Sequence, residues 1–115
     1  MATDADFIAY VLDQAALPGL GHRRMFGEYA LYLEGRVVGF ACDNQLFLKP
    51  TEAARALLDT PREGQPWPGA RPHWLLADEL EDRLLLQRLL RETAAALPLP
   101  APKTPRRKGA ATAKA

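Results

Sequence analysis

Two tight turn signals divide the segment from Met25 to Lys49 into three short runs of β-favouring residues, and this division constrains the fold more than any other feature. The signals are Glu34-Gly35, a tight-turn dipeptide, and Asp43-Asn44, whose residues both tolerate positive φ. The runs 25–33, 36–42 and 45–49 are rich in aromatic and other β-compatible residues. The sequence therefore predicts a three-stranded antiparallel meander, a sheet type that usually has one dry face and one solvated face.

Helical patterns flank the predicted meander. Residues 3–16 favour a helix that Thr3 caps and Pro18-Gly19 ends. Residues 51–58 favour a short helix, residues 59–72 a proline-rich loop, and residues 73–77 a short strand. The apolar face of the first helix would consist of Phe7, Ile8, Val11, Leu12 and Ala15.

The last predicted helix is the longest and most apolar. Asp78 is its expected N-cap, with Glu81 at the capping-box position. Its apolar stripe is Leu80, Leu84, Leu85, Leu89, Leu90 and Ala94. We expect Phe40, Leu84 and Trp74 to be buried together between the sheet and this helix.

The aromatic residues of the meander are interpreted as core rather than as a base-stacking platform. They are Phe26, Tyr29, Tyr32, Phe40 and Phe47. The basic, glycine-rich strand pattern of RNA-recognition sheets is absent. Trp74 is expected to anchor the last strand to the core, and Trp67 to be partly exposed in the proline-rich loop.

Charge divides the chain into a mildly acidic body and a basic tail. Residues 1–96 hold ten basic residues against fourteen acidic ones, whereas residues 97–115 carry five basic residues and no acid. Closely spaced prolines and few large apolar residues predict that residues 98–115 form a disordered tail. Residues 1–97 are expected to form one domain.

The lack of a signal-peptide pattern and the single cysteine predict a protein of the cytoplasm. Cys42 is the single cysteine, so no internal disulfide can form. The N-terminus has no signal-peptide pattern, and no apolar run approaches the roughly 20 residues that span a bilayer. We therefore expect a cytoplasmic protein without membrane association.

Catalytic and metal-binding patterns are weak. His22 and His73 lack the Cys, Asp or Glu neighbours that a metal site or a catalytic triad needs, and Cys42 is expected to be a buried small side chain. Gly19-Leu20-Gly21 is interpreted as helix termination rather than a phosphate loop. Arg23, Arg24 and Trp67 are the candidate contacts for a protein partner, because arginine and tryptophan are common anchors at interfaces.

The chain resembles the TfoX/Sxy N-terminal domain over roughly residues 5–96. The first match runs from Arg24-Met25-Phe26-Gly27 through Tyr29, Tyr32 and Gly35 to Phe40-Ala41. The second is Leu46-Phe47-Leu48-Lys49, and the third is Trp74 followed by Asp78-Glu79-Leu80-Glu81-Asp82. Glu28 departs from the family's second glycine, and the family's helical C-terminal domain has only the basic tail in its place.

The resemblance implies a two-layer α+β fold, similar to secretion-chaperone-like domains, with helices on an antiparallel sheet. It also implies a non-enzymatic module without cofactor or metal, tied to the regulation of competence and DNA-uptake genes. The expected partner is a transcription regulator or a second copy in a homodimer. The alternative is a small nucleic-acid-associated protein whose tail makes weak, non-specific phosphate contacts through Lys103, Arg106, Arg107, Lys108 and Lys114.

Overall fold

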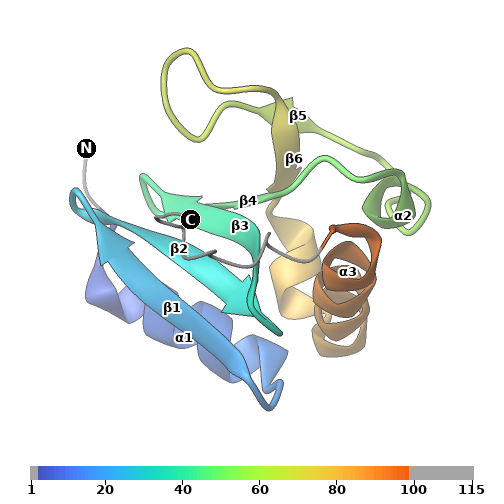
Figure 1. The fold of residues 1–115 in the computed structure, drawn as a ribbon, viewed down its shortest axis with the longest axis horizontal. Coiled ribbons are helices and arrows are strands. Elements are labelled where there is room, and N and C mark those ends of the chain that lie inside the picture. The colour runs from blue at the N-terminus through green and yellow to red at the C-terminus, as the bar shows by residue number, and fades with distance from the viewer. Residues whose placement is uncertain (1–2, 99–115) are drawn as a thin grey trace, which may run out of the picture.

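A six-stranded antiparallel sheet with helices packed on one face forms the protein (Figure 1). The computed structural model describes residues 3–98. The elements in chain order are α1 (Ala5–Ala15), β1 (Leu20–Met25), β2 (Glu28–Leu33), β3 (Arg36–Cys42), β4 (Gln45–Leu48), α2 (Glu52–Arg55), β5 (Glu63–Gly64), β6 (His73–Leu76), the 3-10 helix η1 (Asp78–Glu81) and α3 (Arg83–Ala96). The strand order is β1-β2-β3-β4-β6-β5, so the predicted α+β class is confirmed. The predicted tail lies outside the described residues except for Pro98.

The predicted turns of the meander are confirmed. Glu34 and Gly35 have φ values of 54° and 78°, and Asp43 and Asn44 have values of 54° and 57°. Positive φ at both central positions is the geometry of two-residue hairpin turns, whose twist matches that of the flanking strands. The third strand of the sheet, β3, has the predicted bounds.

The expected single strand over residues 25–33 is wrong. A turn at Phe26 and Gly27, with φ values of 50° and 84°, divides this region into the antiparallel hairpin β1–β2. A phenylalanine at positive φ is uncommon, so the residue types at this position favour a strand and give no turn signal. His22, Arg23 and Arg24, which precede the predicted strand, lie in the edge strand β1.

The expected helix caps at Thr3 and Asp78 are also wrong. Asp4 occupies the N-cap position of α1, and the Thr3 hydroxyl instead donates a hydrogen bond to the Glu28 carboxylate. Asp82 caps α3, because its carboxylate accepts from the Leu85 N–H at 3.1 Å. The predicted capping residues Asp78 and Glu81 form the short 3-10 helix instead.

Two smaller boundaries differ as well. The helix expected over residues 51–58 is confined to α2, where Thr51 caps by accepting from the Ala54 N–H. The loop expected over residues 59–72 contains the two-residue strand β5, which pairs with β6.

Apolar clusters cover both faces of the sheet, so the expectation of one dry face and one solvated face is wrong. The larger cluster joins one sheet face to α1, α2 and α3, and its members include Ile8, Val11, Leu31, Leu46, Trp74, Leu86, Leu89 and Leu90. The smaller cluster consists of Ala30, Phe40, Cys42 and Phe47 on the opposite face. Each fully buried leucine or valine stabilises the fold by about 1.5–3 kcal/mol.

One predicted core grouping is corrected. Trp74 is buried in the larger cluster as expected, and its indole N–H donates to the Thr51 carbonyl at 3.1 Å. Phe40 lies on the other face of the sheet, and Leu84 is 78% exposed on α3. Because α3 begins after Asp82 rather than after Asp78, Leu86 takes the buried position that the sequence pattern assigned to Leu84.

Candidate functional site

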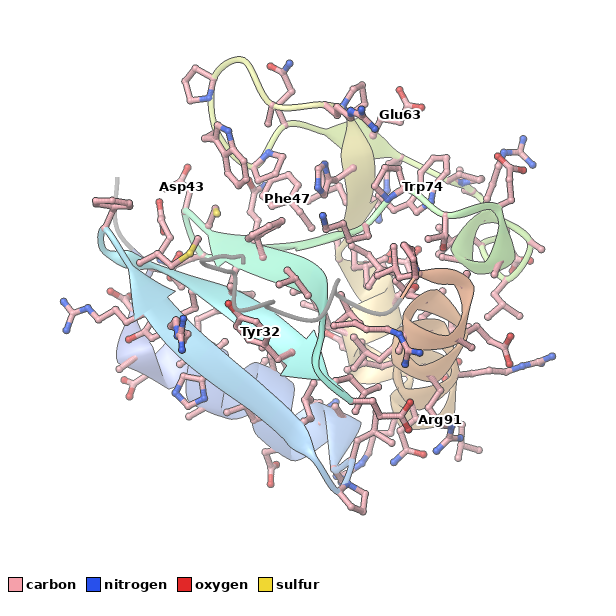
Figure 2. The ribbon with its side chains drawn as sticks, viewed as in Figure 1. Tyr32, Asp43, Phe47, Glu63, Trp74 and Arg91 are labelled. Atoms are coloured by element: carbon pink, nitrogen blue, oxygen red, sulfur yellow. The ribbon has the colours of Figure 1, made fainter. Side chains whose placement is uncertain are left out.

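The sheet face that carries the smaller cluster, called the outer face below, is the candidate site. A row of paired residues crosses four strands there: Ala30 on β2, Phe40 on β3, Phe47 on β4 and Leu75 on β6. Residues paired in register project from the same face, so these side chains form one continuous apolar strip. Figure 2 shows Tyr32 and Phe47 in front of the sheet, whereas α1 lies behind it.

The proline-rich loop covers one part of the outer face. The Trp67 ring meets the Phe40 ring edge to face, with centroids 5.0 Å apart and planes at 85°. The His73 ring also lies edge to face against Phe40, at 5.7 Å. Such aromatic pairs contribute about 0.5–1.5 kcal/mol beyond the burial of their area. The contacts therefore hold the loop to the strip, although Trp67 remains 45% exposed.

Two cations lie over the aromatic rings. The Lys49 ammonium is 5.7 Å from the centre of the Phe40 ring, and the Arg23 guanidinium is 5.8 Å from the centre of the Tyr32 ring. Exposed cation–π contacts of this kind are worth about 0.5–1 kcal/mol each. Arg23 is exposed, whereas Lys49 is half-buried.

Next to the strip lies a hollow that we call the aromatic groove. It consists of an apolar pocket of about 340 Å³ and an adjoining pocket of about 460 Å³. Together they are lined by Met25, Phe26, Glu28, Cys42, Asp43, Gln45, Phe47, Gln65, Pro66, Trp67 and Pro68. Phe26, at the tip of the β1–β2 hairpin, is fully exposed beside this groove. Exposed apolar side chains that gather beside a pocket, rather than lie singly, are typical of interaction sites.

The far end of the groove is acidic and internally ordered. The Glu28 carboxylate accepts from the Thr3 hydroxyl and from the Asp43 N–H at 3.2 Å. Burial, together with the negative charges of Glu28 and Asp43, raises the pKa of the Cys42 thiol to about 11. Cys42 is therefore a protonated, buried thiol at neutral pH, in agreement with the sequence interpretation.

The near end of the outer face is basic. A pocket of about 210 Å³ there is lined by Lys49, Pro50, Thr51, Arg71, His73 and Leu97. His73 is buried, and its Nδ1 lies 2.8 Å from the Arg71 carbonyl oxygen, so Nδ1 carries the proton and donates. Burial lowers the pKa of His73, against the raising effect of the Arg71 carbonyl, and Lys49 and Arg71 lower it further. His73 is thus a neutral packing residue at pH 7.

The structure separates the predicted partner contacts. Arg23 and Trp67 both lie on the outer face. Arg24 pairs with Tyr29, which belongs to the larger cluster, so Arg24 lies on the helix-covered side of the edge strand. The tail residues Lys103, Arg106, Arg107, Lys108 and Lys114 lie outside the described residues.

The family-motif residues divide between structural and surface positions. Gly27 and Gly35 form turns, while Tyr29 and Trp74 belong to the larger cluster. Arg24 lies on the helix-covered side. Met25, Phe26, Tyr32, Phe40 and Lys49 lie on the outer face or at the groove.

Sequence reasoning missed that these outer-face residues form one surface. The signal was present in the alternation of residues 40, 42 and 47, which are apolar on the strand side opposite to Leu46 and Leu48. Val37 joins this side only because the pairing of β2 with β3 shifts register there. Phe26 was assigned to the core, and its full exposure is a correction that follows from its place in the turn.

No metal-binding cluster of His, Cys, Asp or Glu occurs within residues 3–98. His22 packs against Tyr29 at 5.7 Å on the helix-covered side, whereas His73 lies on the outer face, so the two histidines do not share a site. None of the helices in the described part is long and apolar enough to cross a bilayer.

Comparison with known proteins identifies relatives of this chain. The family model described as the TfoX N-terminal domain matches residues 14–97. A Spirochaeta aurantia protein described as an uncharacterized 12.7 kDa protein in the trpE 5' region is 53% identical over 105 residues, which cover 90% of each chain. No solved structure gives a significant match.

Proposed function

Because the chain belongs to the TfoX N-terminal domain family, a family of regulatory domains, we propose that it is a non-enzymatic protein-interaction module that uses the aromatic groove as its interface. The partner proposed is a transcription regulator of the cytoplasm, in the control of competence and DNA-uptake genes. A second copy of the chain in a homodimer is the other protein partner considered.

One observation supports the groove most strongly, the exposure of Phe26. Phe26 is fully exposed beside the half-exposed Trp67, and together they border an apolar pocket of about 340 Å³. Aromatic side chains next to a pocket are typical energetic anchors of protein interfaces. The flanking cation of Arg23 fits a partner that brings carboxylates to the rim of the interface.

A capture experiment with matched variants tests this proposal. The full chain, Phe26→Ser and Leu84→Ser would each serve as bait in native cell extract, and captured proteins would be identified by mass spectrometry. Leu84 is the control, because it is another large, exposed apolar side chain but lies on α3, away from the groove. We expect Phe26→Ser to lose a transcription regulator that the other two baits retain. Equal capture by all three baits would contradict the groove as the interface.

The second candidate function is nucleic-acid contact through the tail. Residues 97–115 carry five basic residues and no acid, which favours phosphate binding without sequence preference. Charge reversal of Arg106, Arg107 and Lys108 to Glu in the full chain should abolish such binding. Gel-shift measurements at low and high salt would detect it, and DNA binding that survives the reversal would contradict this candidate.

A further inference from the structure

We propose that the aromatic groove is also an internal docking site for the chain's own segment 99–108, whose prolines cover the aromatic strip while its basic residues meet the acidic end of the groove. The inference rests on the proposed function, because it assigns a second, regulatory occupant to the same interface. Four features of the described residues and of the sequence support it.

The first feature is where the chain leaves the described structure. Leu97, directly after α3, is half-buried and lines the basic pocket together with Lys49 and His73. His73 in turn packs on Phe40, at the start of the aromatic strip. Leu97 also packs against the larger cluster, so the described chain ends at the border between the helix-covered side and the outer face.

The second feature is reach. The strip follows β4 backwards from Lys49 to Gln45, four strand residues that span about 13 Å. Residues 99–105 include prolines at positions 100, 102 and 105, and six steps of polyproline II conformation cover about 19 Å. The segment is therefore long enough to pass over Phe40 and Phe47 and to bring residues 103–108 to the groove.

The third feature is the chemistry of the surface. Proline-rich segments dock into shallow grooves lined by aromatic side chains, because their extended conformation is already ordered before binding. The outer face offers Tyr32, Phe40 and Trp67 in such an arrangement. Residues 99–102 carry no charge, so the cations of Lys49 and Arg71 at the near end do not repel them.

The fourth feature is charge complementarity at the far end. Glu28 and Asp43 line the 460 Å³ pocket, and the ion pairs of the described residues lie elsewhere, at Glu34–Arg36 and Arg62–Glu79. The segment brings Lys103, Arg106, Arg107 and Lys108 to this end. Exposed pairs of this kind are individually weak, so several of them acting together would give a bound state that a partner can displace.

Internal docking would regulate the proposed interface. A segment and a partner that share one groove compete, so the apparent affinity for the partner is the intrinsic affinity multiplied by the fraction of molecules whose groove is free. Any change that weakens the segment's charges, including nucleic acid that binds the same basic residues, would then release the groove.

Paramagnetic relaxation in the full chain tests the docking directly. A nitroxide label would be attached to the variant Thr104→Cys, while Cys42 stays unlabelled because its thiol is buried and protonated. We expect selective loss of the backbone amide signals of Met25 and Phe26 and of the Trp67 indole signal. The amide signals of α1, on the opposite face of the sheet, should be unchanged.

Charge variants and a mixed sample complete the experiment. Glu28→Gln with Asp43→Asn keeps the hydrogen-bond acceptors and the turn, and should restore the signals, whereas the control Asp13→Asn on α1 should not. Absent or unselective signal loss, or loss that persists in the double variant, would overturn the proposal. Signal loss that arises only between labelled and unlabelled molecules would overturn internal docking in favour of a second copy. No partner is needed, so failure here is distinguishable from failure of the capture experiment.

Discussion

Gly39, in the middle of β3, gives the sharpest stability prediction. A Cβ at this position would lie 2.4 Å from the Phe47 carbonyl oxygen on the neighbouring strand. This neighbour is a backbone atom that pairs in the sheet, so it cannot swing aside as a side chain does. Gly39→Ala would therefore force β3 and β4 apart by roughly 1 Å to reach ordinary contact distance.

The loss of stability in Gly39→Ala has two sources, steric overpacking and weakened hydrogen bonds between β3 and β4. Overpacking of this kind costs about 1–3 kcal/mol. Each neighbouring ladder hydrogen bond, such as Lys49 N–H to the Val38 carbonyl at 2.8 Å, contributes about 0.5–1.5 kcal/mol. Alanine also lowers the conformational entropy of the unfolded chain, which offsets about 0.4–1 kcal/mol of this loss in the free energy of unfolding. We expect a net loss of about 2–3 kcal/mol in the free energy of unfolding, or a fall of about 10–20 °C in Tm.

Gly21 is the matched control for this measurement. It also lies in a strand and lacks a positive φ, but a Cβ there would meet no heavy atom within 4 Å. Gly21→Ala should leave Tm unchanged or raise it slightly. Urea unfolding and thermal melts followed by circular dichroism would compare the two variants, and a Gly39→Ala midpoint equal to that of Gly21→Ala would refute the steric argument.

Three further predictions concern the turn, the thiol and the buried histidine. Gly27→Val should lower the free energy of unfolding by about 1–3 kcal/mol in urea titrations, because Gly27 has a φ of 84°, and an unchanged midpoint would contradict this. Cys42 should react with a thiol reagent at pH 8 only as fast as the domain unfolds, since its pKa is raised to about 11; immediate reaction would show an accessible thiol. Burial lowers the pKa of His73 from 6.5, so the unfolded chain binds more protons and stability should fall as pH drops below about 6.5. His73→Gln should flatten that part of the stability profile, and an unaltered profile would assign the effect to other groups.

Local signals predicted most of the meander. The dipeptides Glu34-Gly35 and Asp43-Asn44 contain residues that accept positive φ, namely Gly35, Asp43 and Asn44, and β-favouring residues flank them, so local conformation decided these turns. The hairpin before them was missed, because Phe26 at φ 50° adopts a conformation that its own side chain disfavours. Pairing of β1 with β2 along six residues holds this turn, and such pairing is not visible in a single segment.

The start of the last helix was mispredicted for a related reason. The pattern from Leu80 onward fits one helix that begins at Asp78, but the chain forms a 3-10 turn first and starts α3 at Arg83. That delay rotates the buried stripe, so Leu86 enters the core and Leu84 faces solvent. Leucine occupies several neighbouring positions here, so the apolar pattern alone does not distinguish a helix that begins at Asp78 from one that begins at Arg83.

The candidate site was predictable by residue type but not by location. Aromatic residues on a meander were expected in the core, because a sheet with helices on one side usually has a solvated second face. Here the second face is apolar as well, and the proline-rich loop covers only the part near Phe40. The exposed remainder, with Phe26 beside a pocket that ends at Glu28 and Asp43, is an apolar surface with an acidic border.

The acidic border formed by Glu28 and Asp43 distinguishes the two candidate functions of the basic tail, nucleic-acid binding and internal docking. A basic segment that serves only nucleic acid gains nothing from an acidic groove on its own domain, since the carboxylates of Glu28 and Asp43 compete with phosphates for the same cations. A basic segment that regulates a groove needs those carboxylates. Removing their charge with Glu28→Gln and Asp43→Asn should therefore strengthen any DNA binding by the full chain if the segment docks internally. It should leave DNA binding unchanged if the segment is independent of the groove, an outcome that gel shifts at fixed salt would show.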